Sequence, residues 1–230
     1  MTRNEGVGIY GGTYNPIHVG PLRAAEEVAE AVGLERVSFV PSAQPPHKRA
    51  SDDDPIAPAE ERLAWVRAAV ADNPRFDVDA LEVERGGASF AVDTLRSIGA
   101  RTSPRLPVFI IGQDAFIELG SWREPEKLLE LAHFAVTTRP PVTRRSLADW
   151  LPAIYRDRVE IAPDGLSGRH RDAGTWIRSI EISHLDISSS DIRARLRVGR
   201  SVRYLIPDGV HAAITASGAY RAHAKSERSA

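Results

Sequence analysis

The chain has 230 residues, of which 42% are hydrophobic and 27% are charged, and its formal net charge is −1. These values suit a globular chain of about one domain and give no electrostatic case for wrapping nucleic acid. The absence of cysteine excludes disulfides and thiolate metal sites, and the longest apolar runs are far shorter than a bilayer span. Residues 1–30 lack the apolar core of a signal peptide, so we expect a cytoplasmic protein without a membrane partner.

Near the start of the chain, an apolar run at 7–10 ends in Gly11 and Gly12, turns at Asn15-Pro16, and continues as a helix that begins beside His18. This order predicts a buried strand that feeds an amphipathic helix. The glycines let the backbone approach a ligand, and the helix start offers unpaired N–H groups and a positive dipole end to an anion. The stretch therefore predicts a phosphate site, although turn chemistry also explains the glycines and His18 can equally be a helix cap.

Apolar periodicity and turn residues predict the remaining elements in chain order. Further strands are expected at 36–41, at 76–79 with 81–83, from 107 to Gly112 and Asp114, from 133, and at 176–182. Helices are expected at 59–71, from 91, at 125–131, at 146–155, from about 190, and up to 217. Strand, helix and strand at this spacing imply a parallel crossover, so we predict an α/β fold with a doubly wound, mainly parallel sheet.

Three local features carry their own expectations. Ser89 is a candidate N-cap for the helix from Ala91, and Ser188 with Asp191 resembles a capping box. The stretch 163–174, rich in glycine and charge, is expected to be a flexible loop. Asp114, at the carboxyl edge of a buried strand, is placed either to hold a ribose or to cap the next helix.

Two separated motifs resemble those of one superfamily. Gly-Gly-Thr-Tyr-Asn-Pro-Ile-His-Val-Gly at 11–20 resembles the Gly-Gly-Thr-Phe-Asp-Pro-Ile-His-x-Gly-His signature of the nucleotidyltransferases, and 187–193 resembles their Ile-Ser-Ser-Thr-x-Ile-Arg. Within the superfamily, the chain looks most like the bacterial nicotinate-nucleotide adenylyltransferases. The resemblance covers about 7–220 and implies a Rossmann-like fold in a single domain, 1–220, with a small C-terminal helical part at about 188–220 and a flexible tail at 221–230.

The resemblance implies that an acceptor mononucleotide attacks ATP. The products would be nicotinate adenine dinucleotide and pyrophosphate, as in NAD biosynthesis. The catalytic residues carried over are His18, Lys48 and Arg193. Mg²⁺ would arrive with ATP and take few or no protein ligands, so no protein metal site is expected. The expected partners are thus ATP and a mononucleotide, with a homo-oligomer left open.

The family motifs also assign the two binding sites. The residues expected to bind ATP are Gly11, Gly12, Thr13, His18, His47, Lys48, Gly112, Asp114, Arg139, Ile187, Ser188, Ser189, Ser190 and Arg193. The residues expected at the acceptor are Thr13, Tyr14, Asn15, Ser89, Phe90, Ala91, Trp122, Arg123 and His184. Trp122 is the candidate for stacking on the pyridine ring.

Three positions depart from the family pattern. Pro21 replaces a histidine, Ala91 replaces a threonine that contacts the nicotinate carboxylate, and His184 stands where relatives often carry an aromatic residue. Proline suits the first turn of a helix but cannot donate to phosphate. Two alternatives therefore stay open: a sister nucleotidyltransferase with another acceptor or nucleotide donor, and a nucleotide-binding homologue of reduced activity.

Overall fold

The computed structural model describes residues 6–46, 55–138 and 146–220. Within these ranges, eight strands form one sheet in the order β3-β2-β1-β4-β5-β8-β7-β6. The strands are β1 Val7–Gly12, β2 Arg36–Pro41, β3 Phe76–Val78, β4 Val108–Gly112, β5 His133–Thr138, β6 Val159–Ile161, β7 Ser167–His170 and β8 Trp176–Glu181.

The sheet is parallel from β3 through β8, and the last two pairs, β8 with β7 and β7 with β6, are antiparallel. The expected doubly wound, mainly parallel sheet is confirmed. The strand order reverses between the neighbours β1 and β4, where Gly8 pairs with Val108. In open α/β sheets this reversal leaves a crevice at the carboxyl ends of the two strands, so Gly12 and Gly112 mark the edge where a ligand is expected.

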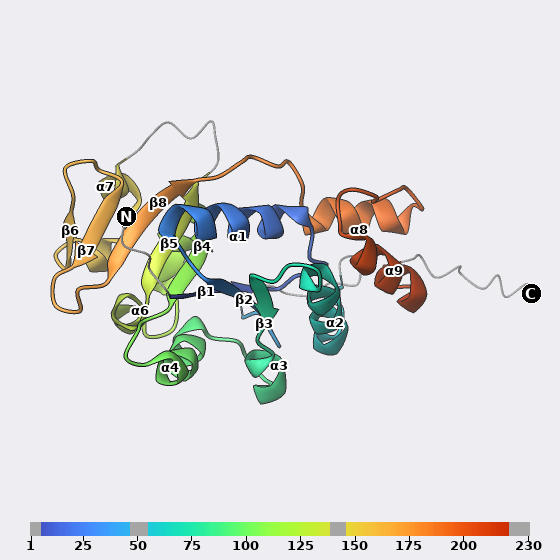
Figure 1. Cartoon of the computed structure of the whole chain (residues 1–230), viewed down its shortest axis with the longest axis horizontal. Helices are drawn as coiled ribbons and strands as arrows, with labels where there is room; N and C mark the ends of the chain where they lie inside the picture. Colours follow the sequence, from blue (N-terminus) through green and yellow to red (C-terminus); the bar gives the residue numbers. More distant parts are fainter. Residues whose placement is uncertain (1–5, 47–54, 139–145, 221–230) are drawn as a thin grey trace, which may run out of the picture.

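Helices cover the sheet on both sides. They are α1 Val19–Val32, α2 Ala59–Val70, α3 Leu81–Arg85, α4 Ala91–Thr102, α5 Gln113–Ile117, α6 Pro125–Leu131, α7 Leu147–Trp150, α8 Ser189–Arg197 and α9 Asp208–Ser217, with 3-10 turns η1 Glu118–Ser121 and η2 Ala153–Tyr155. Figure 1 shows α1 on one side of the sheet, α4 and α6 on the other, and α8 and α9 together at one end.

The sheet separates two apolar cores. One core joins α1 and α2 to α8 and α9 through residues such as Val28, Trp65 and Ile192. The other core packs α4, α6 and α7 on the opposite face, around Leu95 and Leu128. The C-terminal helices thus share a core with α1, which brings the second sequence motif close to the first.

Three sequence expectations about elements are wrong, for local reasons. Residues 81–83 begin the short helix α3 and not a strand, because the Asp79 side chain accepts the Leu81 N–H over 3.0 Å and starts a turn. The expected helix at 146–155 is broken into α7 and η2, with Pro152 between them. The expected loop at 163–174 contains β7, which pairs with both β6 and β8.

Candidate active site

A cavity of about 180 Å³ opens at the carboxyl ends of the strands next to the reversal point. It is lined by Gly11, Gly12, Thr13, Ser42, Pro45, Pro46, Glu82, Ser89, Phe90, Ala91, Thr94, Phe109, Trp122 and Arg123. Most of this surface is apolar, with a few polar groups at its edges, as is usual for a pocket that holds a flat organic ring.

The cavity brings together most of the residues expected at the acceptor. Its walls include Thr13 from the glycine loop, Ser89, Phe90 and Ala91 from the start of α4, and the Trp122-Arg123 pair that follows η1. Gly11 and Gly12, which belong to the expected ATP set, line the same cavity as these expected acceptor residues.

Gly12 is required by its neighbour. A Cβ at this position would lie 2.8 Å from Cζ of the Tyr14 ring, closer than real side chains pack. Tyr14 is itself buried, and its hydroxyl donates to the Tyr10 carbonyl over 2.7 Å. Tyr14 therefore packs against the glycine loop inside the protein and does not line the cavity.

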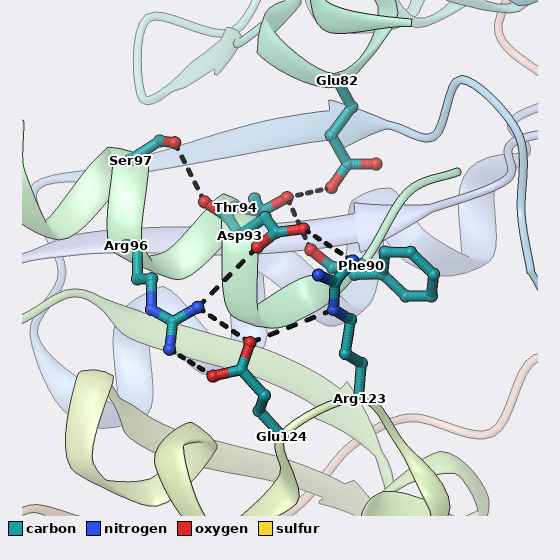
Figure 2. A network of polar contacts seen from close by, with 8 residues as sticks. All are labelled: Glu82, Phe90, Asp93, Thr94, Arg96, Ser97, Arg123 and Glu124. Atoms are coloured by element: carbon teal, nitrogen blue, oxygen red, sulfur yellow. Dashed lines mark hydrogen bonds and ion pairs between the residues drawn. The ribbon is translucent and has the colours of Figure 1, made fainter. Parts of the chain in front are cut away.

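A buried carboxyl group lies at the cavity wall. Glu82 is buried in α3, and the hydroxyl of Thr94 in α4 donates to it (Figure 2). Burial raises the pKa of Glu82, and hydrogen bonds from Thr94 and Ser89 oppose that shift. The sequence predicted Ser89 as the N-cap of α4, which is wrong: Phe90 occupies the cap position, and the Ser89 hydroxyl oxygen accepts the Ala43 N–H over 2.9 Å.

Arg123 stands at the cavity rim within a charged network (Figure 2). Its guanidinium lies 4.7 Å from the centre of the Phe90 ring, and its ion pairs with Asp93 and Glu124 are long, at 3.7 and 3.9 Å. Arg96 instead holds Glu124 through two hydrogen bonds, one of 3.0 Å, and lowers the pKa of that carboxyl. The loosely paired Arg123 can therefore turn toward an anion in the cavity more easily than Arg96 can.

His18 caps α1. Its Nδ1 accepts the Gly20 N–H over 3.2 Å, and a neutral imidazole whose Nδ1 accepts carries its proton on Nε2. A Cβ on Gly20 would lie 2.8 Å from the His18 ring, so glycine at this position is what lets the ring lie over the helix start. The capping and phosphate-donor alternatives are thus compatible, because they use different nitrogens.

The expectation that α1 offers unpaired N–H groups to an anion is wrong for its first three residues. The Val19 N–H donates to the Leu205 carbonyl over 3.0 Å, and the Gly20 N–H donates to His18. Pro21, the third residue of the helix, has no N–H. What remains at this helix end is its dipole and the His18 side chain.

The start of α8 is built differently. Ser188 caps it by accepting the Asp191 N–H over 3.1 Å, as predicted. The N–H groups of Ser189 and Ser190 find no acceptor among the described residues. The second motif, and not the first, therefore presents backbone donors at a helix N-terminus, the arrangement that binds phosphate groups.

The two motifs meet. Arg193 of α8 is buried and donates from Nη1 to the Asn15 carbonyl over 2.7 Å and from Nη2 to Ser190 Oγ over 3.0 Å. The Ser189 hydroxyl donates to the Pro16 carbonyl over 2.9 Å. The loop that leads into His18 is thus fastened to the start of α8, so both helix beginnings border one region.

Asn15 braces neighbouring segments. Its side-chain oxygen accepts the Ala57 N–H over 3.0 Å and the Tyr220 hydroxyl, and its Nδ2 donates to the Pro55 carbonyl over 3.1 Å. An aspartate, as in the family signature, could not make the last bond. Asn15 does not line the cavity, so its observed contacts are structural.

The remaining expected residues lie elsewhere. Gly112 is the N-cap of α5, Asp114 is exposed in the first turn of that helix, and Ile187 packs against the α1 core. His184 is exposed, does not line the cavity, and follows Ser183, which binds Glu27 of α1. His47, Lys48 and Arg139 lie outside the described residues.

Sequence reasoning missed several residues of this region: Ser42, Arg62, Glu82, Thr94, Phe109 and Tyr220. One signal was available for Arg62, because it lies three and four positions before Trp65 and Val66 and so shares the apolar face of the predicted helix. None of the described helices is long and apolar enough to cross a membrane. Across 6–46, 55–138 and 146–220, no group of three or more His, Asp or Glu residues is placed to hold a metal.

Comparison with known proteins adds independent evidence. The family model described as cytidylyltransferase-like matches residues 9–195. A protein of Trichlorobacter lovleyi named probable nicotinate-nucleotide adenylyltransferase is 41% identical over 216 residues, which cover 94% of this chain and 99% of that one. One of the same name from Syntrophotalea carbinolica is 40% identical over 96% of this chain and 99% of its own.

Solved structures share the fold. Plasmodium falciparum nicotinic acid mononucleotide adenylyltransferase, complexed with APC, superposes with a TM-score of 0.66 at 16% identity and covers 94% of this chain and 97% of its own. A putative nicotinate-nucleotide adenylyltransferase from Vibrio parahaemolyticus gives a TM-score of 0.59 at 15% identity, over 95% and 97% of the two chains. On the strength of the matches at about 40% identity over nearly the whole chain, the protein belongs to the nicotinate-nucleotide adenylyltransferase family.

Proposed function

We propose that the protein transfers the adenylyl group of ATP to nicotinate mononucleotide and forms nicotinate adenine dinucleotide and pyrophosphate, a step of NAD biosynthesis. An oxygen of the acceptor phosphate bonds to the α-phosphorus of ATP as the bond from that phosphorus to the pyrophosphate oxygen breaks. The observation that carries the proposal is the junction of Arg193 with the loop before His18, which makes one border from both phosphate-binding motifs.

The described residues suit a reaction that needs alignment and charge stabilisation, because the attacking phosphate is already anionic. His18 Nε2 would donate to the bridging phosphates, and the Ser189 and Ser190 N–H groups would bind the far end of the triphosphate. Arg193 would hold the loop and add positive charge. Lys48, His47 and Arg139 complete the proposed ATP set, with Asp114 at a ribose.

The cavity is the proposed site of the pyridine ring. Its apolar walls and half-buried Trp122 suit a flat aromatic ring, and Arg123 at the rim suits a carboxylate. Because Ala91 has no hydroxyl to donate, Arg123 would be the residue that pairs with the carboxylate of the acceptor. We propose that Mg²⁺ enters with ATP, held by phosphate oxygens and water, because the described donor set contains no carboxylate cluster.

The test is a turnover assay. Purified protein is incubated with nicotinate mononucleotide and Mg-ATP, and the dinucleotide and pyrophosphate are measured together. Equal amounts of both products support the proposal. Turnover only with another phosphomonoester or another nucleoside triphosphate supports the sister-transferase alternative, and ATP binding without pyrophosphate release supports the nucleotide-binding homologue that Pro21 motivates.

Two further expectations accompany this function. Use of ATP supports a cytoplasmic location, and we propose that residues 1–220 act as one domain.

A further inference from the structure

Arg62 is a buried arginine without a carboxylate partner in the described chain. Its residue is 1% exposed, and burial lowers the pKa of its guanidinium. Its nitrogens instead donate to three backbone carbonyls: Nε to Ala57 over 2.8 Å, Nη1 to Thr13 over 2.7 Å and Nη2 to Ala43 over 2.8 Å. Burying a charge this way is costly, so a position on the apolar side of α2 needs a reason.

The three carbonyls come from three segments, two of which contribute residues to the cavity wall. Thr13 lies in the loop after β1 and lines the cavity itself. Ala43 follows Ser42, another lining residue, and its N–H donates to the hydroxyl of Ser89, which also lines the cavity. Ala57 lies just before α2, and its N–H donates to Asn15. One planar guanidinium therefore joins two of the segments that line the cavity, at Thr13 and at Ser42-Ala43, to the segment before α2.

The bond to Thr13 also orients the peptide that follows it. Because a trans peptide is planar, turning the Thr13 carbonyl toward Arg62 turns the Tyr14 N–H in the opposite direction, away from α2. The contact thus sets the direction of the glycine loop as well as its distance from the Ala43 segment. None of this requires the side chain to reach a substrate.

We infer that Arg62 is a positioning residue for the transfer reaction, which holds the Thr13 and Ala43 walls at the separation that the acceptor needs. The inference rests on the proposed function. A lysine at this position keeps the charge, but its single nitrogen cannot reach three carbonyls that a guanidinium reaches from three nitrogens. Arg62→Lys therefore separates charge from geometry.

The experiment compares Arg62→Lys with Arg67→Lys, a matched change at an exposed position of the same helix. Because a displacement of about 1 Å can cost about a hundredfold in rate, kcat/KM for the acceptor should fall about tenfold to a hundredfold in Arg62→Lys, mainly through a raised KM. The Arg67→Lys control should keep wild-type kinetics. A lower Tm of Arg62→Lys with unchanged kcat and KM for both substrates overturns the inference.

A second variant covers a failure of Arg62→Lys to fold. Arg62→Ala is assayed with millimolar guanidinium chloride against sodium chloride at equal ionic strength. If guanidinium chloride restores activity to Arg62→Ala and lowers its acceptor KM, the positioning role is supported. If guanidinium chloride restores only the Tm, and kcat and KM of the variant equal those of wild type without it, the positioning role is overturned. If wild-type protein forms no dinucleotide, the proposed function fails, and the inference about Arg62 is then decided by binding of nicotinate mononucleotide. A higher Kd for Arg62→Lys than for Arg67→Lys supports the inference. Equal Kd values for the two variants overturn it.

Discussion

The Arg193 guanidinium donates to the Asn15 carbonyl over 2.7 Å, although the two residues are 178 positions apart in the chain. The bond fastens the loop before His18 to the start of α8, where Ser189 and Ser190 present their N–H groups. The geometry of the proposed triphosphate site thus depends on one buried side chain, Arg193.

Arg193→Lys should uncouple these two roles. A lysine has its donors on one nitrogen and cannot reproduce the two positions from which Nη1 and Nη2 reach Asn15 and Ser190. A buried carbonyl left unpaired costs about 1–3 kcal/mol of folding free energy. We expect a lower Tm and a fall in kcat/KM for ATP of about a hundredfold. Arg195→Lys on the same helix, where the half-buried arginine pairs with Asp191, is the control and should stay close to wild type in both measurements.

Gly20→Ala should displace the His18 ring. The new Cβ would meet the ring at 2.8 Å, so the imidazole must leave its cap position and Nε2 must move with it. We expect kcat to fall about a hundredfold, as on losing one charge-stabilising donor. Gly99→Ala in α4, where no atom lies within 4 Å of the new Cβ, should leave kcat unchanged. Equal kcat in both variants would count against a role for His18.

Pro21→His tests what the departure from the family signature costs. Position 21 lies in the first turn of α1, where proline is tolerated, so the exchange should leave Tm nearly unchanged. An added donor beside His18 should raise kcat by about tenfold to a hundredfold. Measurements at saturating ATP and acceptor decide the matter, and an unaltered kcat would show that this chain stabilises the charge in another way.

Arg123→Met should weaken acceptor binding selectively. If the guanidinium pairs with the nicotinate carboxylate, its loss should raise the acceptor KM about tenfold to a hundredfold, because a hydrogen bond to a charged group contributes about 1.5–3 kcal/mol. The preference for nicotinate over nicotinamide mononucleotide should shrink, while the KM for ATP stays the same. Arg36→Met removes an exposed arginine that pairs with Asp77 at the amino end of β2, away from this network and from the cavity wall, and its acceptor KM should remain that of wild type.

His133 should make the folded protein less stable as the pH falls below about 6.5. Burial lowers its pKa from 6.5 to about 4, with nearby Arg178 and Arg169 adding to the effect, while Nδ1 accepts the Trp176 N–H over 3.1 Å. As the pH falls, His133 therefore takes up a proton near pH 6.5 in the unfolded chain but only near pH 4 in the folded protein. The contribution of neutral His133 to the free energy of unfolding is complete above pH 6.5 and is lost as the pH falls toward 4. Tm scans between pH 7 and 4 should be flatter for His133→Gln, and parallel curves for the two proteins would contradict this.

Much of the fold was open to prediction because its signals are local. The buried strand β2 and the helix α6 have the predicted bounds, since an apolar run or a proline at the first helical position marks each of them. Residues 81–83 failed because an Asp79 side-chain bond, which a propensity argument does not count, begins a helix there. β7 was missed because glycine and arginine in Ser167–His170 look like a loop until two neighbouring strands bind their backbone.

Sequence alone determined the family motifs and the sheet class, because short-range pattern and spacing carry that information. It also named Thr13, Ser89, Phe90, Ala91, Trp122 and Arg123, which line one cavity in the structure. Only the tertiary structure decided which hydrogen-bond donors are paired within the protein and which are left to bind an anion. It gives the N–H groups of Val19 and Gly20 to Leu205 and His18 and joins Arg62 and Arg193 to loop carbonyls. The reason is physical: a hydrogen-bonding group pairs with whatever the fold brings within about 3 Å of it, and for these groups most of those partners lie far along the chain.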